Sequence, residues 1–151
     1  MSATDRPPRP GEVGGRDYLF LSTEEFERRR DDGGFLEWFE VYGDLKGTPR
    51  APIEEHLAAG DDVLVEVDVH GALAIQEQLP EAFTVFVRAP SRAAQRARLQ
   101  ERDGGATADA RLEQAEGEER LADRFDAVVV NDDIDTAVAE VAAILEAHRS
   151  G

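Results

Sequence analysis

Hydrophobic and polar residues alternate along this chain with two periods, and the period changes several times between the two ends. Period-two runs rich in aromatic or β-branched residues predict strands, whereas helical spacing between capping residues and breakers predicts helices. We therefore expect strands at residues 18–21, 35–42, 63–69, 83–88 and 127–130, of which 63–69 has the strongest pattern. We expect helices at residues 22–30, 49–59, 72–78, 92–102, 108–122 and 135–147.

Local signals support several of these boundaries. Ser22 or Thr23 is placed to cap the first helix, Glu25 is in position for a capping box, and Gly33 and Gly34 end the helix. Breaks are expected in the Pro- and Gly-rich loop 5–16, in a turn at 43–44, and at 103–105. From residue 50 onward the strands alternate with helices, which is typical of an α/β fold with a parallel sheet.

The composition excludes several classes of function. The 33 acidic and 17 basic residues give a formal net charge of −16, so the chain is unsuited to nucleic acid, whose phosphates it would repel. We expect no membrane partner, because no apolar run reaches the roughly 18 residues of a membrane span and the first residues lack a signal-peptide pattern. The chain has no cysteine, which excludes disulfides and thiolate metal sites and fits a cytoplasmic location.

The basic residues are almost all arginine, and Lys46 is the only lysine. Arginine makes bidentate contacts with phosphate, although a GC-rich genome would produce the same bias. Arg6 and Arg9 flank two prolines, which restrict the loop and could hold two guanidinium groups ready for one anion. A solvated basic loop is the alternative for such a pair.

Acidic residues occupy two of the predicted strands. Glu37 lies among apolar residues; its two oxygens could accept hydrogen bonds from the paired N–H donors of guanine, or the side chain could face solvent. In the strand predicted from 63 onward, period two places Glu66, Asp68 and His70 on one side. Acids on a core strand need a partner, and a metal triad with His70 is one interpretation, although a single strand spreads such ligands apart.

Three further arginines lie in the two polar helices. Arg98 and Arg102 share a helix face, where an anion between them would relieve their mutual repulsion. Arg111 follows in the next helix. A surface helix with Glu101 and Asp103 as ion partners is the alternative.

The last predicted strand ends in Asn131, Asp132 and Asp133. The carboxyl ends of strands in α/β folds are common places for ligands. Either aspartate could instead cap the last helix.

Taken in order, these segments resemble the sequence motifs of guanylate kinases. In that family a segment Ser-Ala-Thr-Thr-Arg-Pro-Pro-Arg-Pro-Gly-Glu holds the phosphate of GMP, and residues 2–12 read SATDRPPRPGE. The other matching segments are GGRDYLFLS at 14–22, GFLEW at 34–38, GTPR at 47–50, EVDVHG at 66–71, RLQER at 98–102, RL at 111–112 and VVVNDD at 128–133. The resemblance covers nearly the whole chain, from Ser2 to about Leu145.

The resemblance implies an α/β fold of the P-loop kinase type, in which a parallel sheet with flanking helices carries a small GMP-binding subdomain and a helical lid. The expected parts are a GMP-binding region at 1–50, a core at 51–97 and 120–151, and a lid at 98–119. The activity that it implies is phosphoryl transfer from ATP to GMP, giving ADP and GDP, with Mg²⁺ accompanying ATP. We therefore expect GMP and ATP as ligands.

The resemblance also implies roles for individual residues. The residues expected to bind the GMP phosphate are Ser2, Arg6, Arg9 and Tyr18. Those expected to recognise guanine are Glu37, Thr48 and Asp68, with Glu66 near the Mg²⁺–phosphate region. Those expected to stabilise the transferring phosphoryl group are the lid arginines Arg98, Arg102 and Arg111, whereas Asn131 and Asp132 would neighbour adenine.

Two of the chain's departures from the family pattern concern phosphate binding. Lys46 replaces a tyrosine of Gly-Asn-Tyr-Tyr-Gly-Thr, and its ammonium could bind the GMP phosphate as a point charge. A P-loop requires Gly-Lys-Ser/Thr, but Lys46 is followed by Gly47, so these residues contain no P-loop. The family's first strand, P-loop and first helix are not among these residues; one hypothesis is that Met1 is a start assigned too late, and a real loss of the segment is the alternative. We also expect poor folding and little kinase activity from the chain alone.

Two other functions stay open at this stage. Guanylate kinase-like domains of membrane-associated scaffolds have lost ATP handling, so the chain could be a non-catalytic module that binds GMP or phosphopeptides. The presence of Glu37, Asp68 and the lid arginines argues against this alternative. A generic α/β fragment without a ligand is the third possibility.

Overall fold

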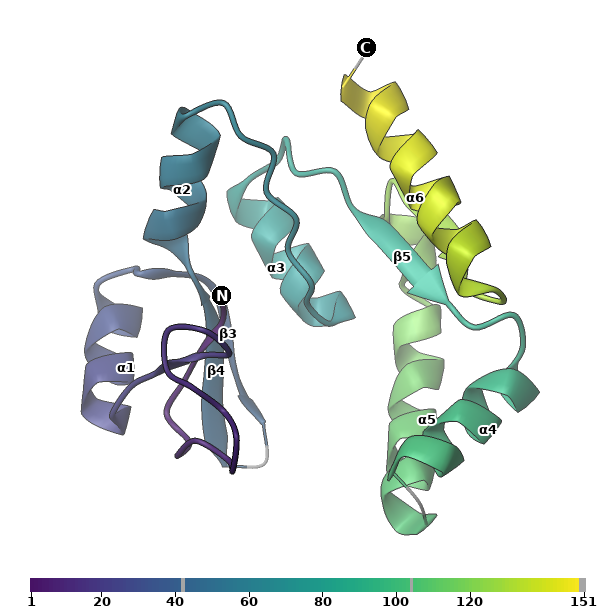
Figure 1. Cartoon of the computed structure of the whole chain (residues 1–151), viewed down its shortest axis with the longest axis horizontal. Coiled ribbons are helices and arrows are strands. Elements are labelled where there is room, and N and C mark those ends of the chain that lie inside the picture. The colour runs from purple at the N-terminus through teal and green to yellow at the C-terminus, as the bar shows by residue number, and fades with distance from the viewer. Residues whose placement is uncertain (42, 104, 150–151) are drawn as a thin grey trace. The chain divides into compact units, whose positions relative to one another are not determined.

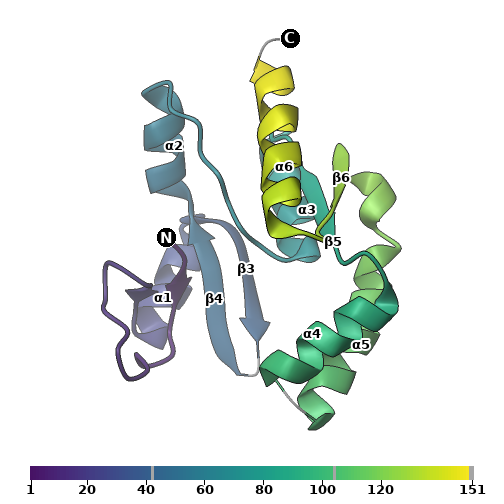
Figure 2. The ribbon, with the colours of Figure 1, turned by 45° about the vertical axis from the view of Figure 1, so that its right-hand side comes forward.

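The computed structural model describes residues 1–41, 43–103 and 105–149, without the side chains of residues 102, 103, 105–108 and 110. The chain folds into two compact units, Met1–Glu81 and Ala82–Gly151. Figures 1 and 2 show the elements of both units. Each unit has its own sheet and helices, as the predicted α/β class requires. The finer division at residues 50, 97 and 119 stays a prediction.

The first unit is built on a four-stranded sheet with the order β2-β1-β4-β3. Its strands are β1 (Ala3–Thr4), β2 (Leu19–Phe20), β3 (Phe35–Val41) and β4 (Asp44–Pro49). β1 and β2 are parallel, whereas β4 is antiparallel to β1 and β3. The helices are α1 (Thr23–Asp31), α2 (Arg50–Ala58) and α3 (Val69–Gln78). The sequence pattern missed β1 and β4, because β1 is too short to show a period and β4 is mostly polar.

Helix α1 begins where the capping pattern predicts. The backbone N–H of Glu25 donates to Ser22 Oγ at 3.1 Å. Acidic residues in the first turn and arginines in the last complement the helix dipole. Gly33, at a φ of 72°, lies just beyond the end of the helix. Phe26 is fully buried and stacks on Phe35 with 4.4 Å between ring centroids, which fixes α1 against the sheet.

The face of the sheet toward α1, which we call the core face, is apolar. Ala3, Leu19 and Leu45 pack there with Phe26 and Phe35. Side chains alternate along a strand and cross-strand partners share a face. The pairing of Ala3 with Leu19 therefore accounts for the common side of these two residues.

The opposite face, which we call the polar face, carries Thr4, Lys46, Thr48 and Glu37. Lys46 pairs with Thr4 between β4 and β1, and Thr48 pairs with Glu37 between β4 and β3. Leu45 on the core face lies next to Lys46 in the chain, so the alternation of β4 separates the two faces.

A β-bulge in β3 turns Glu37 onto the polar face. Phe35 pairs with Pro49 but Glu37 pairs with Thr48, so the register shifts by one residue at Leu36. In a regular strand Glu37 would share the core face with Phe35, two residues earlier. The extra residue reverses this direction and leaves a carboxylate beside Thr48.

The prediction of a strand at residues 63–69 is wrong. Residues 61–68 form no strand, and α3 already begins at Val69. Exposure still alternates along this segment between half-buried valines and exposed residues such as Leu64 and Glu66. The period-two pattern thus holds, but a strand also needs a neighbour to complete its hydrogen bonds, and none of the strands in the described residues pairs with this segment.

The second unit contains a parallel two-stranded sheet of β5 (Val85–Arg88) and β6 (Ala127–Val130), as the alternation of strands and helices predicts. Its helices are α4 (Arg92–Asp103), α5 (Gly105–Glu119), a 3-10 turn at Ala122–Arg124 and α6 (Ile134–Arg149). Residues 103 and 105 belong to α4 and α5 rather than to the expected break, and residue 104 lies outside the described residues.

One carboxylate joins the beginnings of β5 and β6. Thr84 donates to Asp126 Oδ2 through both its backbone N–H and its hydroxyl, each at 2.7 Å. These hydrogen bonds hold the pKa of Asp126 below its ordinary value. The carboxylate therefore stays charged and fastens the parallel pair where it starts.

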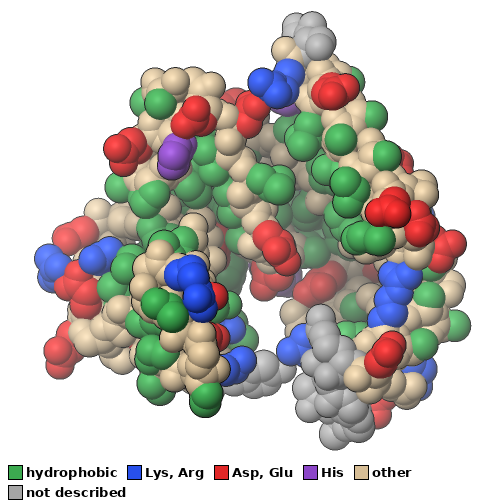
Figure 3. Space-filling model, viewed as in Figure 1, with side chains coloured by type: hydrophobic (Ala, Val, Ile, Leu, Met, Phe, Trp, Pro, Cys, Tyr) green, Lys and Arg blue, Asp and Glu red, His purple; other side chains and the backbone are tan. Residues whose placement is uncertain are grey.

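Helix α6 packs against β6 and exposes Ile134, Val138 and Leu145, and hydrophobic side chains line its visible face in Figure 3. None of the helices in the described ranges is long and apolar enough to cross a membrane.

The close approach of β3 and β4 at Gly47 predicts the effect of a substitution. A Cβ at residue 47 would lie 2.9 Å from the backbone oxygen of Glu37 and 3.1 Å from Trp38 Cβ. Gly47→Ala should force the strands apart and lower the free energy of unfolding by about 1–3 kcal/mol. Gly14→Ala is the control, because its Cβ would make only an ordinary contact with Phe20. Chemical denaturation of the two variants measures the effect, and equal stabilities would contradict it.

Candidate functional site

The base-recognition residues predicted from the sequence meet on the polar face. Glu37 is half-buried, and its Oε1 accepts a hydrogen bond from Thr48 Oγ1 at 2.5 Å. Burial raises the pKa of Glu37 and the negative charge of Asp68 raises it further, whereas the bond from Thr48 acts in the opposite direction. A half-buried carboxylate whose charge is disfavoured forms a site where N–H donors of a ligand would stabilise the charge of Glu37.

Asp68 holds its place as the N-cap of α3, not as part of a strand. Its Oδ1 accepts a hydrogen bond from the backbone N–H of Gly71 at 2.8 Å. A Cβ at residue 71 would lie 3.0 Å from Val67 Cβ, so glycine allows the tight first turn. The expectation that Glu66, Asp68 and His70 line one side of a strand fails with the strand itself, because His70 belongs to α3.

Arg6 is bound within the loop that was expected to grip phosphate. Its NH1 and NH2 atoms donate to the two oxygens of Glu12 at 2.7 and 2.8 Å. Only 8% of Arg6 is exposed, and its guanidinium lies over the rings of Tyr18 and Phe20, 5.1 and 5.6 Å from their centroids. The charge of Arg6 is therefore largely neutralised by an internal carboxylate before any ligand arrives.

The Glu12 carboxylate also binds the backbone of Arg9. The backbone N–H of Arg9 donates to Glu12 Oε2 at 2.7 Å, while the Arg9 side chain is exposed. The side-chain hydrogen bonds from Arg6, together with this backbone bond, hold the pKa of Glu12 at about 2. Sequence reasoning gave Glu12 no role. Its position next to Gly11, which has a φ of 90°, is the signal that the chain turns back toward Arg6.

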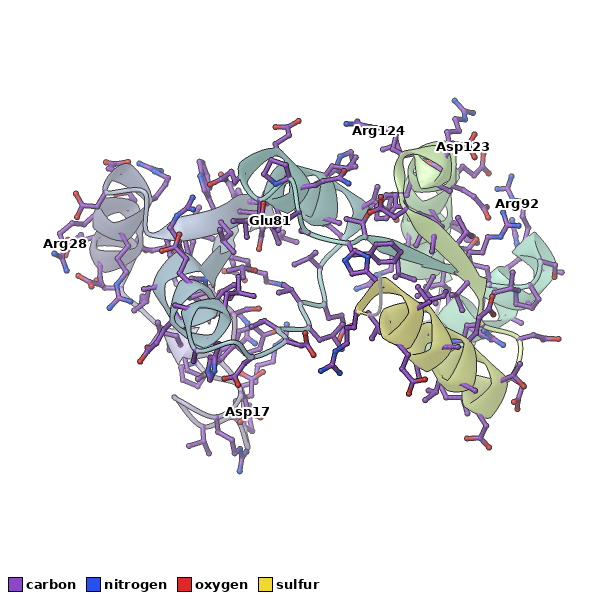
Figure 4. The ribbon with its side chains drawn as sticks, turned by 90° about the horizontal axis from the view of Figure 1, so that it is seen from above. Asp17, Arg28, Glu81, Arg92, Asp123 and Arg124 are labelled. Atoms are coloured by element: carbon purple, nitrogen blue, oxygen red, sulfur yellow. The ribbon has the colours of Figure 1, made fainter. Side chains whose placement is uncertain are left out.

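An open cavity of about 620 Å³ brings several of the expected GMP-binding residues together. The expected residues in its lining are Ser2, Tyr18, Thr48 and Glu66. Glu12 and Asp17 add carboxylates to its wall, and Val63, Leu64 and Val65 add apolar surface. Figure 4 shows Asp17 on the loop before β2 and Arg28 on the outer side of α1. The cavity lies beside the polar face, and α1 does not contribute to its lining.

In the second unit the structure brings one lid arginine to the expected adenine-side residues. Arg98 donates to the backbone oxygens of Asn131 at 2.6 Å and Asp132 at 3.0 Å. These bonds tie α4 to the carboxyl end of β6. Arg111 is half-buried beside the buried Leu112. The side chain of Arg102 lies outside the described residues. The catalytic roles of the three arginines stay predictions.

The described side chains do not form a metal site. Among them no group of three or more His, Asp and Glu residues is arranged to hold an ion. The metal triad considered for His70 thus finds no support among the described residues.

Comparisons with known proteins identify the family of this chain. The family model described as guanylate kinase matches residues 1–148. The chain belongs to the guanylate kinase family. It is 49% identical to a guanylate kinase of Thermus thermophilus over 151 residues, which cover 99% of this chain and 69% of that protein. It is 46% identical to the guanylate kinase of Rubrobacter xylanophilus, covering 100% of this chain and 80% of that protein.

A solved guanylate kinase has the same fold. The crystal structure of guanylate kinase from Anaplasma phagocytophilum matches with a TM-score of 0.80 and 33% identity, covering 97% of this chain and 73% of that chain. The expected α/β fold of the P-loop kinase type is thereby confirmed. The mixed sheet of the first unit and the parallel pair of the second both belong to that fold.

The Arg6–Glu12 pair predicts how the loop responds to acid. The pKa of Glu12 is lowered from 4.5 to about 2, so its contribution to stability is present above pH 4.5 and is lost as the pH falls toward 2. In the Glu12→Gln variant this loss should be absent. The side-chain Nε–H signal of Arg6, followed by NMR between pH 5 and about 2, measures it. A transition that persists unchanged in the variant would contradict the assignment.

Proposed function

We propose that this chain binds GMP on the polar face of its first unit and that its reaction is phosphoryl transfer from ATP to GMP, giving ADP and GDP. The observation that carries the proposal is the half-buried Glu37, bonded to Thr48 and close enough to Asp68 for their charges to interact. Guanine presents adjacent N1–H and N2–H donors, which match carboxylate acceptors, whereas the corresponding edge of adenine offers an acceptor.

The order of the strands supports one orientation for the nucleotide. By continuing the register one residue beyond the starts of β2 and β1, we place Tyr18, Ser2, Thr48 and Glu37 at adjacent positions on the polar face. Adjacent strands lie about 4.8 Å apart, so this row spans about 14 Å. We place guanine at the Glu37 end and the phosphate at the Tyr18 end, where Arg6 and Arg9 follow β1.

The second unit supplies the expected lid. We assign Arg98, Arg102 and Arg111 to stabilising the charge of the transferring phosphoryl group, and Asn131 and Asp132 to the adenine side. Mg²⁺ would accompany the ATP phosphates. The 151 residues contain no P-loop, so the transfer requires one from outside them. Residues 1–50, 51–97, 98–119 and 120–151 then serve as GMP-binding region, core, lid and core.

Calorimetry with GMP and AMP tests the proposal on the purified chain. The wild type should bind GMP in preference to AMP. Glu37→Gln should weaken GMP binding about 10- to 100-fold, which is the loss of affinity expected when a hydrogen bond to a charged group is removed. AMP binding should stay nearly unchanged. Glu40→Gln is the matched control, because Glu40 lies on the same strand, is exposed and pairs with Leu45 of the core face.

Three outcomes would count against the proposal. Equal binding of GMP and AMP by the wild type would remove the basis for guanine recognition. Binding of a phosphopeptide in place of GMP would favour the scaffold alternative. A Glu40→Gln variant that loses as much GMP affinity as Glu37→Gln would show that the strand, and not the carboxylate, is responsible.

A further inference from the structure

Leu36, the extra residue of the β-bulge, has no partner residue in the pairing of β3 with β4. The register passes from Phe35 and Pro49 directly to Glu37 and Thr48. Leu36 has no exposed surface, so its backbone is not hydrated. A buried carbonyl without a donor is as unfavourable as a lost hydrogen bond. A donor from outside the sheet therefore stabilises the bulge.

Gln78, the last residue of α3, supplies this donor. Its Nε2 donates to the backbone oxygen of Leu36 at 2.5 Å. Its Oε1 accepts a hydrogen bond from the guanidinium of Arg50. The two partners fix the orientation of the amide, because a carbonyl can only accept and a guanidinium can only donate. Both ends of the Gln78 amide are thus used beside the bulge.

Arg50 anchors the Gln78 amide to the segments around the bulge. Its Nε donates to the backbone oxygen of Gly33 at 3.1 Å, and its backbone N–H donates to that of Gly34 at 2.9 Å. Arg50 also directly follows Pro49, at the end of β4 where the register shifts. The guanidinium that holds Gln78 is therefore fixed at the same place in the sheet as the bulge itself.

Helix α3 reaches the candidate site from both of its ends. Its N-cap, Asp68, is close enough for its charge to act on Glu37. Its last residue, Gln78, binds the backbone of Leu36, which directly precedes Glu37 in the strand. One helix thus connects the carboxylate of Asp68 with the bulge that directs the carboxylate of Glu37.

We propose that Gln78 is a positioning residue for base recognition, because it stabilises the bulged register in which Glu37 meets Thr48 on the polar face. The inference rests on the proposed GMP function. Without the Gln78 donor, a regular register becomes more favourable, in which Leu36 pairs with Thr48 and Glu37 turns to the core face. The affinity for GMP then falls with the fraction of chains in the bulged register.

Binding of GMP and AMP to a Gln78→Met variant tests the proposal. Methionine nearly keeps the length of the side chain and removes both hydrogen bonds. The preference for GMP over AMP should fall about three- to tenfold, the range expected for one lost hydrogen bond.

Gln76→Met is the matched control. Gln76 lies on the same helix, is half-buried and makes no hydrogen bond among the described residues, so this variant should keep the preference. A Gln78→Met variant with the wild-type preference, or an equal loss in both variants, would overturn the proposal.

Trp38 reports the register in the folded variant, because it is the only tryptophan of the chain and directly follows Glu37. In the bulged register its ring lies 5.1 Å from the Arg30 guanidinium on the core side, whereas in the regular register it would turn to the polar face. The NMR signal of its indole N–H should therefore move in folded Gln78→Met. Loss of stability alone would only add the signal of unfolded chains, and an unmoved folded signal would contradict the proposal.

Two further measurements decide the question if Gln78→Met does not fold. Gln78→Glu keeps an acceptor for Arg50 but at neutral pH has no donor for Leu36, so its GMP preference should fall as well. In the wild type, the side-chain amide protons of Gln78 should exchange with solvent more slowly than those of Gln76. A Gln78→Glu variant with the wild-type preference, or equal exchange at Gln78 and Gln76, would overturn the proposal.

The two proposals fail in different ways. A wild-type chain that prefers GMP over AMP, together with a Gln78→Met variant of equal preference, would overturn the role of Gln78 alone. A wild type without preference for GMP over AMP would overturn both proposals.

Discussion

The β-bulge at Leu36 is the constraint on which the candidate site depends. Phe35 has to reach the core face to stack on Phe26, and a regular strand would then direct Glu37 to the same face. The extra residue separates the two requirements, because Phe35 still packs against α1 while Glu37 meets Thr48 on the opposite side. One irregularity thus lets seven residues of β3 serve both the core and the site.

The charged side chains at the two ends of the polar face have different surroundings. At the β3 end, burial and Asp68 both disfavour the charge of Glu37, so an approaching donor of N–H groups is favoured. At the β2 end, Glu12 neutralises Arg6 and fixes the loop through the backbone of Arg9. The N–H donors of a nucleotide base would therefore complement the β3 end of the polar face.

The sequence predicted the features that depend on local chemistry. Ser22 caps α1 as expected, and the parallel pair of β5 and β6 follows from the alternation of strands and helices. The motifs also singled out Glu37 and Thr48, which a hydrogen bond joins in the structure, whereas their roles in binding stay predictions. Features that depend on a partner distant in the chain escaped prediction. Residues 63–69 have a strand pattern, but none of the described strands pairs with them. The bulge at Leu36 is defined by the pairing of β3 with β4, which the sequence of β3 alone does not give. The bond between Glu12 and Arg6 forms because the loop turns back on itself.

The division of the sheet into two faces is tested most directly by NMR mapping of GMP on the full chain. Glu37 and Trp38 are adjacent, but Trp38 lies on the core side, where the Arg30 guanidinium sits 5.1 Å from its ring centroid. The account predicts that GMP shifts the side-chain signals of Thr48 and Tyr18 and leaves the Trp38 indole N–H and the Leu45 methyl groups unchanged. Shifts centred on Trp38 and Leu45, with Thr48 and Tyr18 unaffected, would contradict it.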